Sequence, residues 1–481
     1  MALIAAVALP LLAALLCWFK PLRSIAWLIT VVCLIGSFAA AVVTTGQVLL
    51  YGHVVAIPEW MEADGLSALL LILVTFVCTL AAVFSGGYMR HETQSKQRLW
   101  WFYCNYNLLV FSLALVPSLA RVNLVWVAVE LVTLFATLLV GYEGTPGALE
   151  AAWKMAILTI MGAPISLFGF LTLYWAFRSA GGGTSETWQG LYSLAATMPP
   201  DLLRLSFLLV FVGFGAKAGL APMHTWLPDA HSQAPTPICA VLSGMKTTIP
   251  LYAILRLLSV VLGSPEARMG QWMVVIGLIS VGIAAFLLLQ VRDYKRMFAF
   301  STVEHMGIIL TAAGFATHAA AYGAVDQMLN HSITKSLCFY AAGMVLMTLE
   351  TRQVSEVRGL FRLSPFTGSA LLLCSLAIAG APPFPIFLSE FSILSSGLRS
   401  GHNVAVAILA TLIVIAFVAI FLQVNSMLFG KPDPSSPPVA IPATCRTAVV
   451  LAAIPVAVLG VYIPGPLHSL LTLAAQQLGG H

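Results

Sequence analysis

Long apolar runs alternate with short polar segments along nearly the whole chain. Hydropathy punctuated by Gly, Pro and charge gives about fourteen runs, which start near residues 2, 25, 64, 99, 121, 150, 204, 234, 271, 297, 318, 366, 403 and 443. Each run is long enough for a helix to cross a hydrocarbon core about 30 Å thick. Because lipid cannot satisfy backbone polar groups, the sequence predicts an all-α integral membrane protein of about 14 transmembrane helices.

Composition supports this prediction and narrows the functional classes. Of the 481 residues, 60% are hydrophobic and 9% are charged, which no soluble fold could accommodate. The first run lacks a basic segment before it and a cleavage site after it, so we expect it to be retained as a span. The eight cysteines show no CxxC spacing, so we expect no metal, cluster or other cofactor. The basic residues form no patch, and nucleic-acid binding is not expected.

The basic residues instead indicate how the chain is oriented. With both termini outside, fourteen of the 23 Lys and Arg residues fall in inward loops, Lys295 among them. Six fall in outward loops, including Arg256, and three lysines fall inside spans. This distribution follows the positive-inside rule and predicts a multi-pass protein of a bacterial or archaeal inner (plasma) membrane. The polar stretches 179–203, expected outward, and 431–438, expected inward, are too short for soluble domains.

Charged side chains occur where lipid would disfavour them. Such a residue at mid-span costs about 2.5 to 3.5 kcal/mol, so it persists mainly where it pairs or lines a wet path. A buried carboxylate holds its proton more tightly and a buried lysine more loosely, which suits proton transfer. For any one residue, the alternative is a structural ion pair between helices. The six charged candidates and two neighbouring histidines are Glu130, Lys217, Lys246, Glu304, Lys335, Glu390, His305 and His331.

Two predicted helices are broken close to one of these charges. Gly and Pro follow Lys217 in GFGAKAGLAP and precede Glu390 in AIAGAPPFPIFLSEF. Discontinuous helices often mark ion pathways in transporters, although a single Pro kink can also be without function. The numbers 304 and 130 differ by 174, and 390 and 217 differ by 173, which indicates an internal duplication.

This spacing predicts two inverted five-helix repeats. We place them at 99–263 and 264–430, after three N-terminal helices in 1–98. An inward Pro-rich loop and the last transmembrane helix occupy 431–481.

Several stretches together carry a resemblance to a known family. They are DGLSALLL (64–71), the span with Glu130, HTWLPDAHSQAPTPICAVLSGMK (224–246), DYKRMFAFSTVEHMG (293–307) and HSITKSLCFYAAG (331–343). The chain resembles the antiporter-like proton-translocating subunits of respiratory complex I and Mrp-type antiporters. Its EHMG and HSITKSL motifs are most similar to those of the F component of hydrogenase 4, a branch found in membrane-bound nickel-iron hydrogenase complexes of the formate hydrogenlyase type.

The resemblance implies a role for each buried charge. Glu130 and Lys217 would be the coupled input pair and Lys246 the connecting lysine, with Glu390 as the exit-side carrier. Between them, the central polar axis would continue through Glu304, His305, His331 and Lys335. The chain would not be catalytic by itself. It would move protons for a complex with other membrane subunits and a peripheral redox arm.

Three other functions are alternatives at this point. They are an Mrp-type Na+/H+ antiporter subunit, a non-pumping structural subunit of a hydrogenase complex, and a quinone-reactive subunit. Two local features are also open. His224, Asp229 and His231 indicate either proton uptake at the inward end of the first broken helix or simple loop packing. Asp326 is expected near the outer surface, with a solvated side chain.

Overall fold

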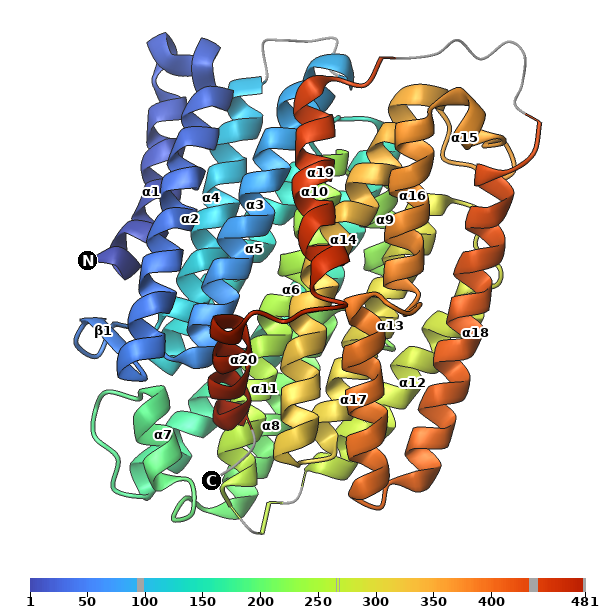
Figure 1. The fold of residues 1–481 in the computed structure, drawn as a ribbon. Helices are drawn as coiled ribbons and strands as arrows, with labels where there is room; N and C mark the ends of the chain where they lie inside the picture. The colour runs from blue at the N-terminus through green and yellow to red at the C-terminus, as the bar shows by residue number, and fades with distance from the viewer. Residues whose placement is uncertain (93–98, 265, 268, 432–439, 479–481) are drawn as a thin grey trace.

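A computed structural model describes residues 1–92, 99–264, 266–267, 269–431 and 440–478. These residues form a bundle of roughly parallel and antiparallel helices (Figure 1). The predicted inward segment 431–438 lies outside the described residues, except for Lys431.

The N-terminal part places its first two α-helices at one edge of the bundle and its third α-helix farther inside. Its elements are α1 (Ala2–Trp18), the 3-10 helix η1 (Lys20–Ile25), α2 (Ala26–Tyr51), β1 (Val54–Ile57), β2 (Met61–Ala63) and α3 (Gly65–Glu92). The two short strands pair antiparallel, with Val54 opposite Ala63. Asp64 follows the hairpin, and its Oδ1 accepts a hydrogen bond from the Ser67 backbone N–H at 2.9 Å at the start of α3.

The middle part contains the first broken helix. Its elements are α4 (Leu99–Ser118), α5 (Val122–Val140), α6 (Pro146–Ser179), α7 (Trp188–Leu194), α8 (Pro200–Ala218), α9 (Trp226–Gln233), α10 (Thr236–Val241), the π-helical turn η3 (Leu242–Lys246) and α11 (Thr248–Leu262). The last three form one continuous helical stretch, Thr236–Leu262.

The C-terminal part contains the second broken helix. Its elements are α12 (Gly270–Leu288), α13 (Tyr294–Gly314), α14 (His318–Leu349), α15 (Leu360–Leu363), α16 (Pro365–Ile378), α17 (Pro385–Arg399), α18 (Asn403–Leu428), α19 (Ala443–Val458) and α20 (Gly465–Leu478). The break lies between α16 and α17.

The all-α membrane fold is confirmed. Ten described helical stretches are long and apolar enough to cross a membrane, and α1, α16 and α19 are shorter apolar helices. Together with α8, they account for fourteen helices, whose first residues all lie within about four residues of the predicted starts. The hairpin, α7, α9, α15, α17 and α20 were not predicted as separate elements.

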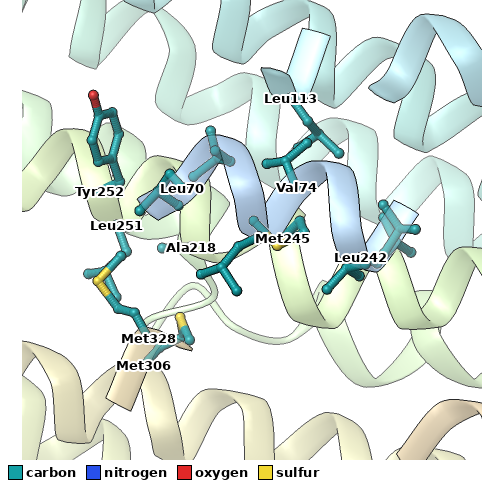
Figure 2. Close-up of a cluster of buried hydrophobic side chains, with 14 of the residues drawn as sticks. Leu70, Val74, Leu113, Ala218, Leu242, Met245, Leu251, Tyr252, Met306 and Met328 are labelled. Carbon is teal, nitrogen blue, oxygen red and sulfur yellow. The ribbon is translucent and has the colours of Figure 1, made fainter. Parts of the chain in front are cut away.

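Glycines let several helices approach closely. A side chain at Gly162 of α6 would meet the backbone of Gly213 on α8, and one at Gly277 of α12 would meet the Gly307 carbonyl on α13. Small residues at such crossings are typical of helix packing in lipid. Farther inside, α3 and α4 pack their apolar side chains against the α10–α11 stretch and α14, as Leu70, Leu113, Met245 and Met328 illustrate (Figure 2).

Two ends of the bundle are distinguished below. The hairpin, α7 and α20 lie in the lower part of Figure 1, which we call the hairpin end; α15 lies at the opposite end, which we call the α15 end. α13 begins at the α15 end, where the Tyr294 N–H donates to the Arg352 carbonyl. α14 therefore begins at the hairpin end and ends at the α15 end.

Candidate functional site

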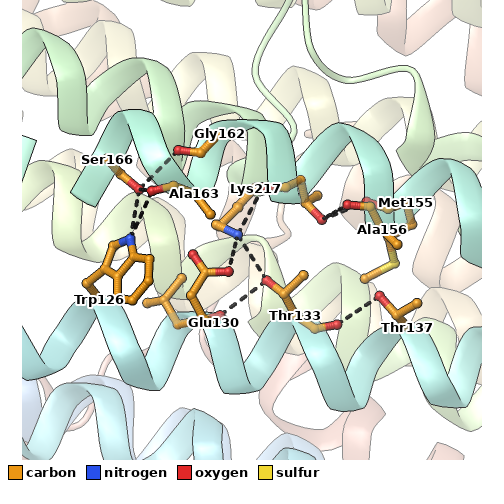
Figure 3. A network of polar contacts seen from close by, with 12 residues as sticks. Trp126, Glu130, Thr133, Thr137, Met155, Ala156, Gly162, Ala163, Ser166 and Lys217 are labelled. Carbon is orange, nitrogen blue, oxygen red and sulfur yellow. Dashed lines mark hydrogen bonds and ion pairs between the residues drawn. The ribbon is translucent and has the colours of Figure 1, made fainter. Parts of the chain in front are cut away.

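Lys217 and Glu130 form an ion pair where α5, α6 and α8 meet (Figure 3). Lys217 Nζ lies 3.0 Å from Glu130 Oε2, 3.0 Å from the Thr159 carbonyl oxygen and 3.3 Å from Thr133 Oγ1. The Lys217 side chain is fully buried, whereas that of Glu130 is 22% exposed. Glu130 Oε1 has no partner among the described residues. It can therefore bind a water while Oε2 keeps its contact with Lys217, and a proton bound there would neutralise the pair.

The first helix break explains why Lys217 can be buried at this place. α8 ends at Ala218 because Gly219 adopts a φ of 78°, and its N–H closes the helix on the Gly215 carbonyl. The last turn of a helix carries unpaired carbonyls and a partial negative charge. Lys217 lies in that last turn, so the helix end helps to stabilise its ammonium group.

Lys246 approaches the same helix end from α10–α11. Its Nζ donates to the Lys217 carbonyl at 3.2 Å and lies 3.5 Å from the centroid of the Trp226 ring. Trp226 Nε1 in turn donates to the Ala216 carbonyl at 2.9 Å. Lys246 closes the π-helical turn η3, a local irregularity often found at functional sites. The ammonium group of Lys246 thus contacts an aromatic face and a carbonyl rather than a carboxylate.

Lys335 occupies a comparable position beside α13. Its Nζ donates to the Phe298 carbonyl at 2.7 Å and contacts Ser301 Oγ. One turn before it on α14, His331 Nε2 lies 3.3 Å from the Ser243 carbonyl, and His331 Nδ1 is buried without a hydrogen-bond partner among the described residues. Ser243 Oγ also contacts Thr302 Oγ1 at 2.7 Å. These contacts connect η3 with α13 and α14.

His305 meets the second helix break as Lys246 meets the first. α16 ends at Ile378, and the Ile378 carbonyl lies 3.1 Å from His305 Nε2. The other ring nitrogen, Nδ1, lies 2.8 Å from Gln327 Nε2. The centroids of the His305 and His331 rings are 5.1 Å apart. In both breaks, an axial side chain therefore satisfies a carbonyl at the end of the first half-helix.

Two carboxylates face this second break. Glu390 is 5% exposed, and its carboxylate lies so close to Gly380 that a side chain there would displace it. Glu304 is 4% exposed, has an unpartnered Oε2 among the described residues, and interacts electrostatically with Lys335 and Glu390. Lys217 lies just before its helix break, whereas Glu390 lies after its own. The equal spacing in sequence does not give them equivalent places.

His224, Asp229 and His231 do not form one cluster. Asp229 pairs with Lys154 at 3.0 Å and with Arg296 in a partly exposed ion network. His231 is fully buried, with Nδ1 2.8 Å from the Leu227 carbonyl.

His231 has different electrostatic neighbours from Asp229. It interacts with Lys246, Lys335 and Lys295, while its Nε2 has no partner in the described part of the chain. His224 is 7% exposed, with an unpartnered Nδ1 in the same part. Asp229 thus fits loop packing, whereas His231 lies among the buried lysines of the bundle.

A polar cavity lies at the end of α9, after His231 in the chain. It has a volume of about 490 Å³ and is lined by Ser232, Gln233, Asp293, Arg296 and Gln353, with further residues of α12 and α13. Ser232 Oγ donates to Asp293 Oδ2 at 2.8 Å. The cavity gives water a place beside Ser232, the residue that follows His231 in the chain.

Three sequence expectations were wrong. Asp326 is not solvated: it is 4% exposed and accepts a hydrogen bond from Asn330 Nδ2 at 3.0 Å. Arg256 is not in a loop but lies in α11, 1% exposed and paired with Asp64. Lys295 is also buried. Its Nζ is satisfied there by donating to the Ala234 carbonyl at the end of α9.

These errors have two physical causes. Asp64 and Arg256 are far apart in sequence, so hydropathy alone could not show that they neutralise each other. Gln327, His331 and Lys335 recur every fourth residue, as do Tyr322, Asp326 and Asn330. This periodicity was visible in the sequence and would have placed Asp326 on a polar face of α14.

Metal ligation has no candidate in the described part of the chain, because no group of three or more His, Cys, Asp or Glu residues there could hold an ion.

Comparison with known proteins gives a consistent picture. A model described as NADH:quinone oxidoreductase/Mrp antiporter, transmembrane, matches residues 120–416. A second, described as NADH-ubiquinone oxidoreductase (complex I), chain 5 N-terminus, matches residues 56–98. A hydrogenase-4 component F homolog of Methylacidiphilum infernorum (isolate V4) is 37% identical over 411 residues, which cover 83% of this chain and 85% of the relative.

Solved structures share the fold. A chain of the membrane-bound sulfane sulfur reductase, an archaeal respiratory membrane complex, superposes with a TM-score of 0.89 at 24% identity. The match covers 99% of this chain and 98% of the other. A chain of the Mrp complex from Dietzia sp. DQ12-45-1b gives a TM-score of 0.86 at 20% identity, covering 98% and 97%. The family resemblance expected from the motifs is confirmed.

Proposed function

Because this chain belongs to the NADH:quinone oxidoreductase/Mrp antiporter family, we propose that it is a proton-translocating membrane subunit of a redox-driven, respiratory-type complex. The similarity to a hydrogenase-4 component F homolog favours a membrane-bound hydrogenase as that complex. Its partners would be further membrane subunits and a peripheral redox arm. The plasma membrane, with both termini outside, is the location that we propose from the distribution of basic residues.

One observation carries the proposal: buried ionisable groups follow one another through the middle of the bundle. Glu130 and Lys217 are paired, and Lys246 touches the carbonyl of Lys217. His231 interacts electrostatically with both Lys246 and Lys335. Beyond them lie Glu304, His331, His305 and Glu390. A purely structural role would favour closed ion pairs, whereas several of these groups have proton-binding atoms without a hydrogen-bond partner in the described part of the chain.

The Glu130–Lys217 pair would couple this line to the redox reaction. While Glu130 is charged, it stabilises the ammonium form of Lys217. A redox event that moved Glu130 or protonated it would leave Lys217 buried without a counter-charge, and Lys217 would then release its proton to the axis. Lys246 and His231 would then pass the proton on, because the charge of its ionisable neighbours affects how each of them holds a proton.

Proton uptake would use the polar cavity at the end of α9. Ser232 and Asp293 line the cavity, and His231 directly precedes Ser232 in the chain. From this space the proton would pass inward to Nε2 of His231, which has no hydrogen-bond partner among the described residues. In the proposed orientation, the cavity faces the inside of the cell.

The test is proton pumping by membrane vesicles that contain the intact complex, driven by its own electron donor, with electron transfer measured separately. Lys217→Ala and Glu130→Gln should reduce pumping by about tenfold or more, since each removes a group that holds or controls the proton. The exposed Lys20→Ala serves as the matched control and should pump normally. Normal pumping by Lys217→Ala in an assembled complex would refute the proposal.

The same vesicles distinguish proton pumping from the alternative function of a Na+/H+ antiporter subunit. Proton pumping should be unchanged when sodium is replaced by choline. Strict dependence on sodium would indicate the Na+/H+ antiporter function instead.

A further inference from the structure

We propose that protons leave the central axis through a polar branch along the first half of α14, with Asp326 as its proton-binding residue and His468 at its surface end. The inference rests on the proposed function and adds a release route to it. The branch consists of Asn330, Asp326 and Tyr322 on α14 and His468 on α20, and it begins at Gln327 and Ser389.

The branch connects directly to the axis. Gln327 Nε2 lies 2.8 Å from His305 Nδ1, and its Oε1 accepts a hydrogen bond from Ser389 Oγ. Ser389 precedes Glu390, so this contact lies at the second helix break. Asn330 Nδ2 lies 3.5 Å from Ser389 Oγ and 3.0 Å from Asp326 Oδ1. Asp326 is thus the first carboxylate on the route beyond His305 and Glu390.

The branch also reaches the surface. Tyr322 lies one turn before Asp326 on α14 and interacts with it electrostatically. The Tyr322 hydroxyl lies 2.9 Å from Nδ1 of His468, an exposed residue of α20. Tyr322 is four residues from the start of α14, about 6 Å along the helix axis, and that start lies at the hairpin end. The proposed orientation makes this the outer side.

An unsatisfied atom indicates where water enters this line. Asn330 Oδ1 is buried and has no hydrogen-bond partner among the described residues. Buried polar atoms in such a position are normally satisfied by an ordered water. Amide groups do not carry protons readily, so Gln327 and Asn330 would hold the water that does. Asp326 would receive the proton from that water.

Release then conserves every proton. The Asp326 carboxyl gives its proton, through a bridging water, to the Tyr322 oxygen as the Tyr322 hydroxyl hydrogen passes to His468 Nδ1. His468 releases the proton on Nε2 to solvent. Asp326 returns to the carboxylate, Tyr322 to the phenol and His468 to a neutral imidazole. No group is consumed, and no co-reactant is needed.

The structural alternative makes a different prediction for one substitution. If Asp326 only anchors Asn330, then Asp326→Asn should be harmless, because the amide oxygen still accepts that hydrogen bond. If Asp326 carries protons, the same substitution removes the proton-binding group at constant shape. Glu186→Gln is the matched control, since Glu186 is another buried carboxyl group, on the loop before α7, and its oxygens have no hydrogen-bond partner among the described residues, the branch included.

The experiment measures proton pumping and electron transfer by the intact complex in oriented vesicles. Asp326→Asn should lower pumping by about tenfold or more, Asp326→Glu should restore most of it, and Glu186→Gln should pump normally. The His468→Ala variant should pump more slowly. Imidazole added on the hairpin-end side should restore its pumping, whereas imidazole on the other side should not. A structural role for His468 predicts no such rescue.

The outcomes separate this inference from the proposed function. Normal pumping by both Asp326→Asn and Lys217→Ala would refute the proposed function, and the branch with it. Loss of pumping in Lys217→Ala, together with normal pumping in an assembled Asp326→Asn complex, would overturn the branch alone. If Asp326→Asn fails to assemble, Tyr322→Phe and the rescue of His468→Ala decide, since both substitutions lie near the surface.

Discussion

Backbone carbonyls fix which nitrogen of each axial histidine can receive a proton. Nε2 of His305 must donate to the Ile378 carbonyl, and Nε2 of His331 must donate to the Ser243 carbonyl. The accepting nitrogen is therefore Nδ1 in both rings. That of His331 has no partner among the described residues, while Gln327 occupies that of His305. A proton entering His305 must displace Gln327, the residue at which the proposed branch begins.

Glu186 lies outside the spans and predicts a pH dependence of stability. Burial raises the pKa of its carboxyl group to about 8, against an ordinary value of 4.5. At a pH between these two pKa values, the native state keeps a proton on Glu186 that the unfolded chain has lost. The free energy of unfolding is therefore highest at low pH and falls as the pH rises towards 8. Glu186→Gln should remove this loss and stabilise the protein by about 2 kcal/mol or more above pH 8.

Apparent melting temperatures of the detergent-purified complex between pH 5 and pH 9 measure this effect. The variant and the native protein should agree near pH 5 and diverge as the pH increases. A constant difference across the range would contradict the assignment.

The candidate site was only partly predictable at the scale of residues. Charges such as Glu130 and Lys217 are conspicuous because lipid penalises them wherever they stand. Neutral polar residues such as Gln327 and Asn330 carry no such penalty signal. Arg256 was misplaced because its partner, Asp64, lies far away in the sequence, just before α3, and only the fold reveals the pair.

At the scale of elements, the two broken helices place their ends inside the bundle. Gly219 and Gly380 both have positive φ values, 78° and 76°, and each is followed by proline within three residues. The carbonyls exposed at these ends accept from Lys246 and His305. The breaks therefore create polar ends where intact helices would offer only apolar surface.

Close helix crossings predict contrasting effects of two glycine substitutions on α12. A Cβ at Gly277 would lie 2.7 Å from the Gly307 carbonyl oxygen, whereas one at Gly282 meets only Leu412 at 3.7 Å. Gly277→Ala should destabilise the protein by about 1 to 3 kcal/mol through overpacking. Gly282→Ala should be neutral or stabilise it by up to about 1 kcal/mol, because alanine favours the helix. Thermal unfolding of both variants in detergent tests this, and equal effects would contradict it.

Most helices were predictable because each must span lipid with an apolar run. The shorter elements were not. α7, α9 and α20 have 7, 8 and 14 residues, too few for the hydropathy signal of a span. Their helicity depends on contacts with the bundle, such as those of Trp226 and His468.

At the scale of the whole molecule, the outer helices present apolar side chains to their surroundings. Trp153, Phe168 and Trp175 of α6 are 63%, 64% and 63% exposed, and Val404 of α18 is 75% exposed. α14, in contrast, is buried along nearly its whole length. The polar groups therefore occupy the middle of the bundle, and lipid or partner helices would cover the apolar faces.

The proposed orientation predicts which side labels introduced cysteines. Gly183, before α7, has no neighbouring atom within 4 Å of an added Cβ, and Ser355 is exposed at the α15 end. A membrane-impermeant maleimide should label Gly183→Cys in intact cells and Ser355→Cys only after lysis. Native background should be low, since seven of the eight cysteines are buried. Labelling of Ser355→Cys in intact cells, and of Gly183→Cys only after lysis, would show that the chain has the opposite orientation.

α14 bears two rows of polar side chains. Tyr322, Asp326 and Asn330 follow one another every fourth residue, as do Gln327, His331 and Lys335. Adjacent positions such as 326 and 327 differ by about 100° around a helix, so the rows point in different directions while sharing one rigid body. Any turn of α14 moves both rows together. A rotation of α14 would then change the contacts of the axis row and of the branch row at the same time, and the fixed angle between the rows would set the order in which the two change.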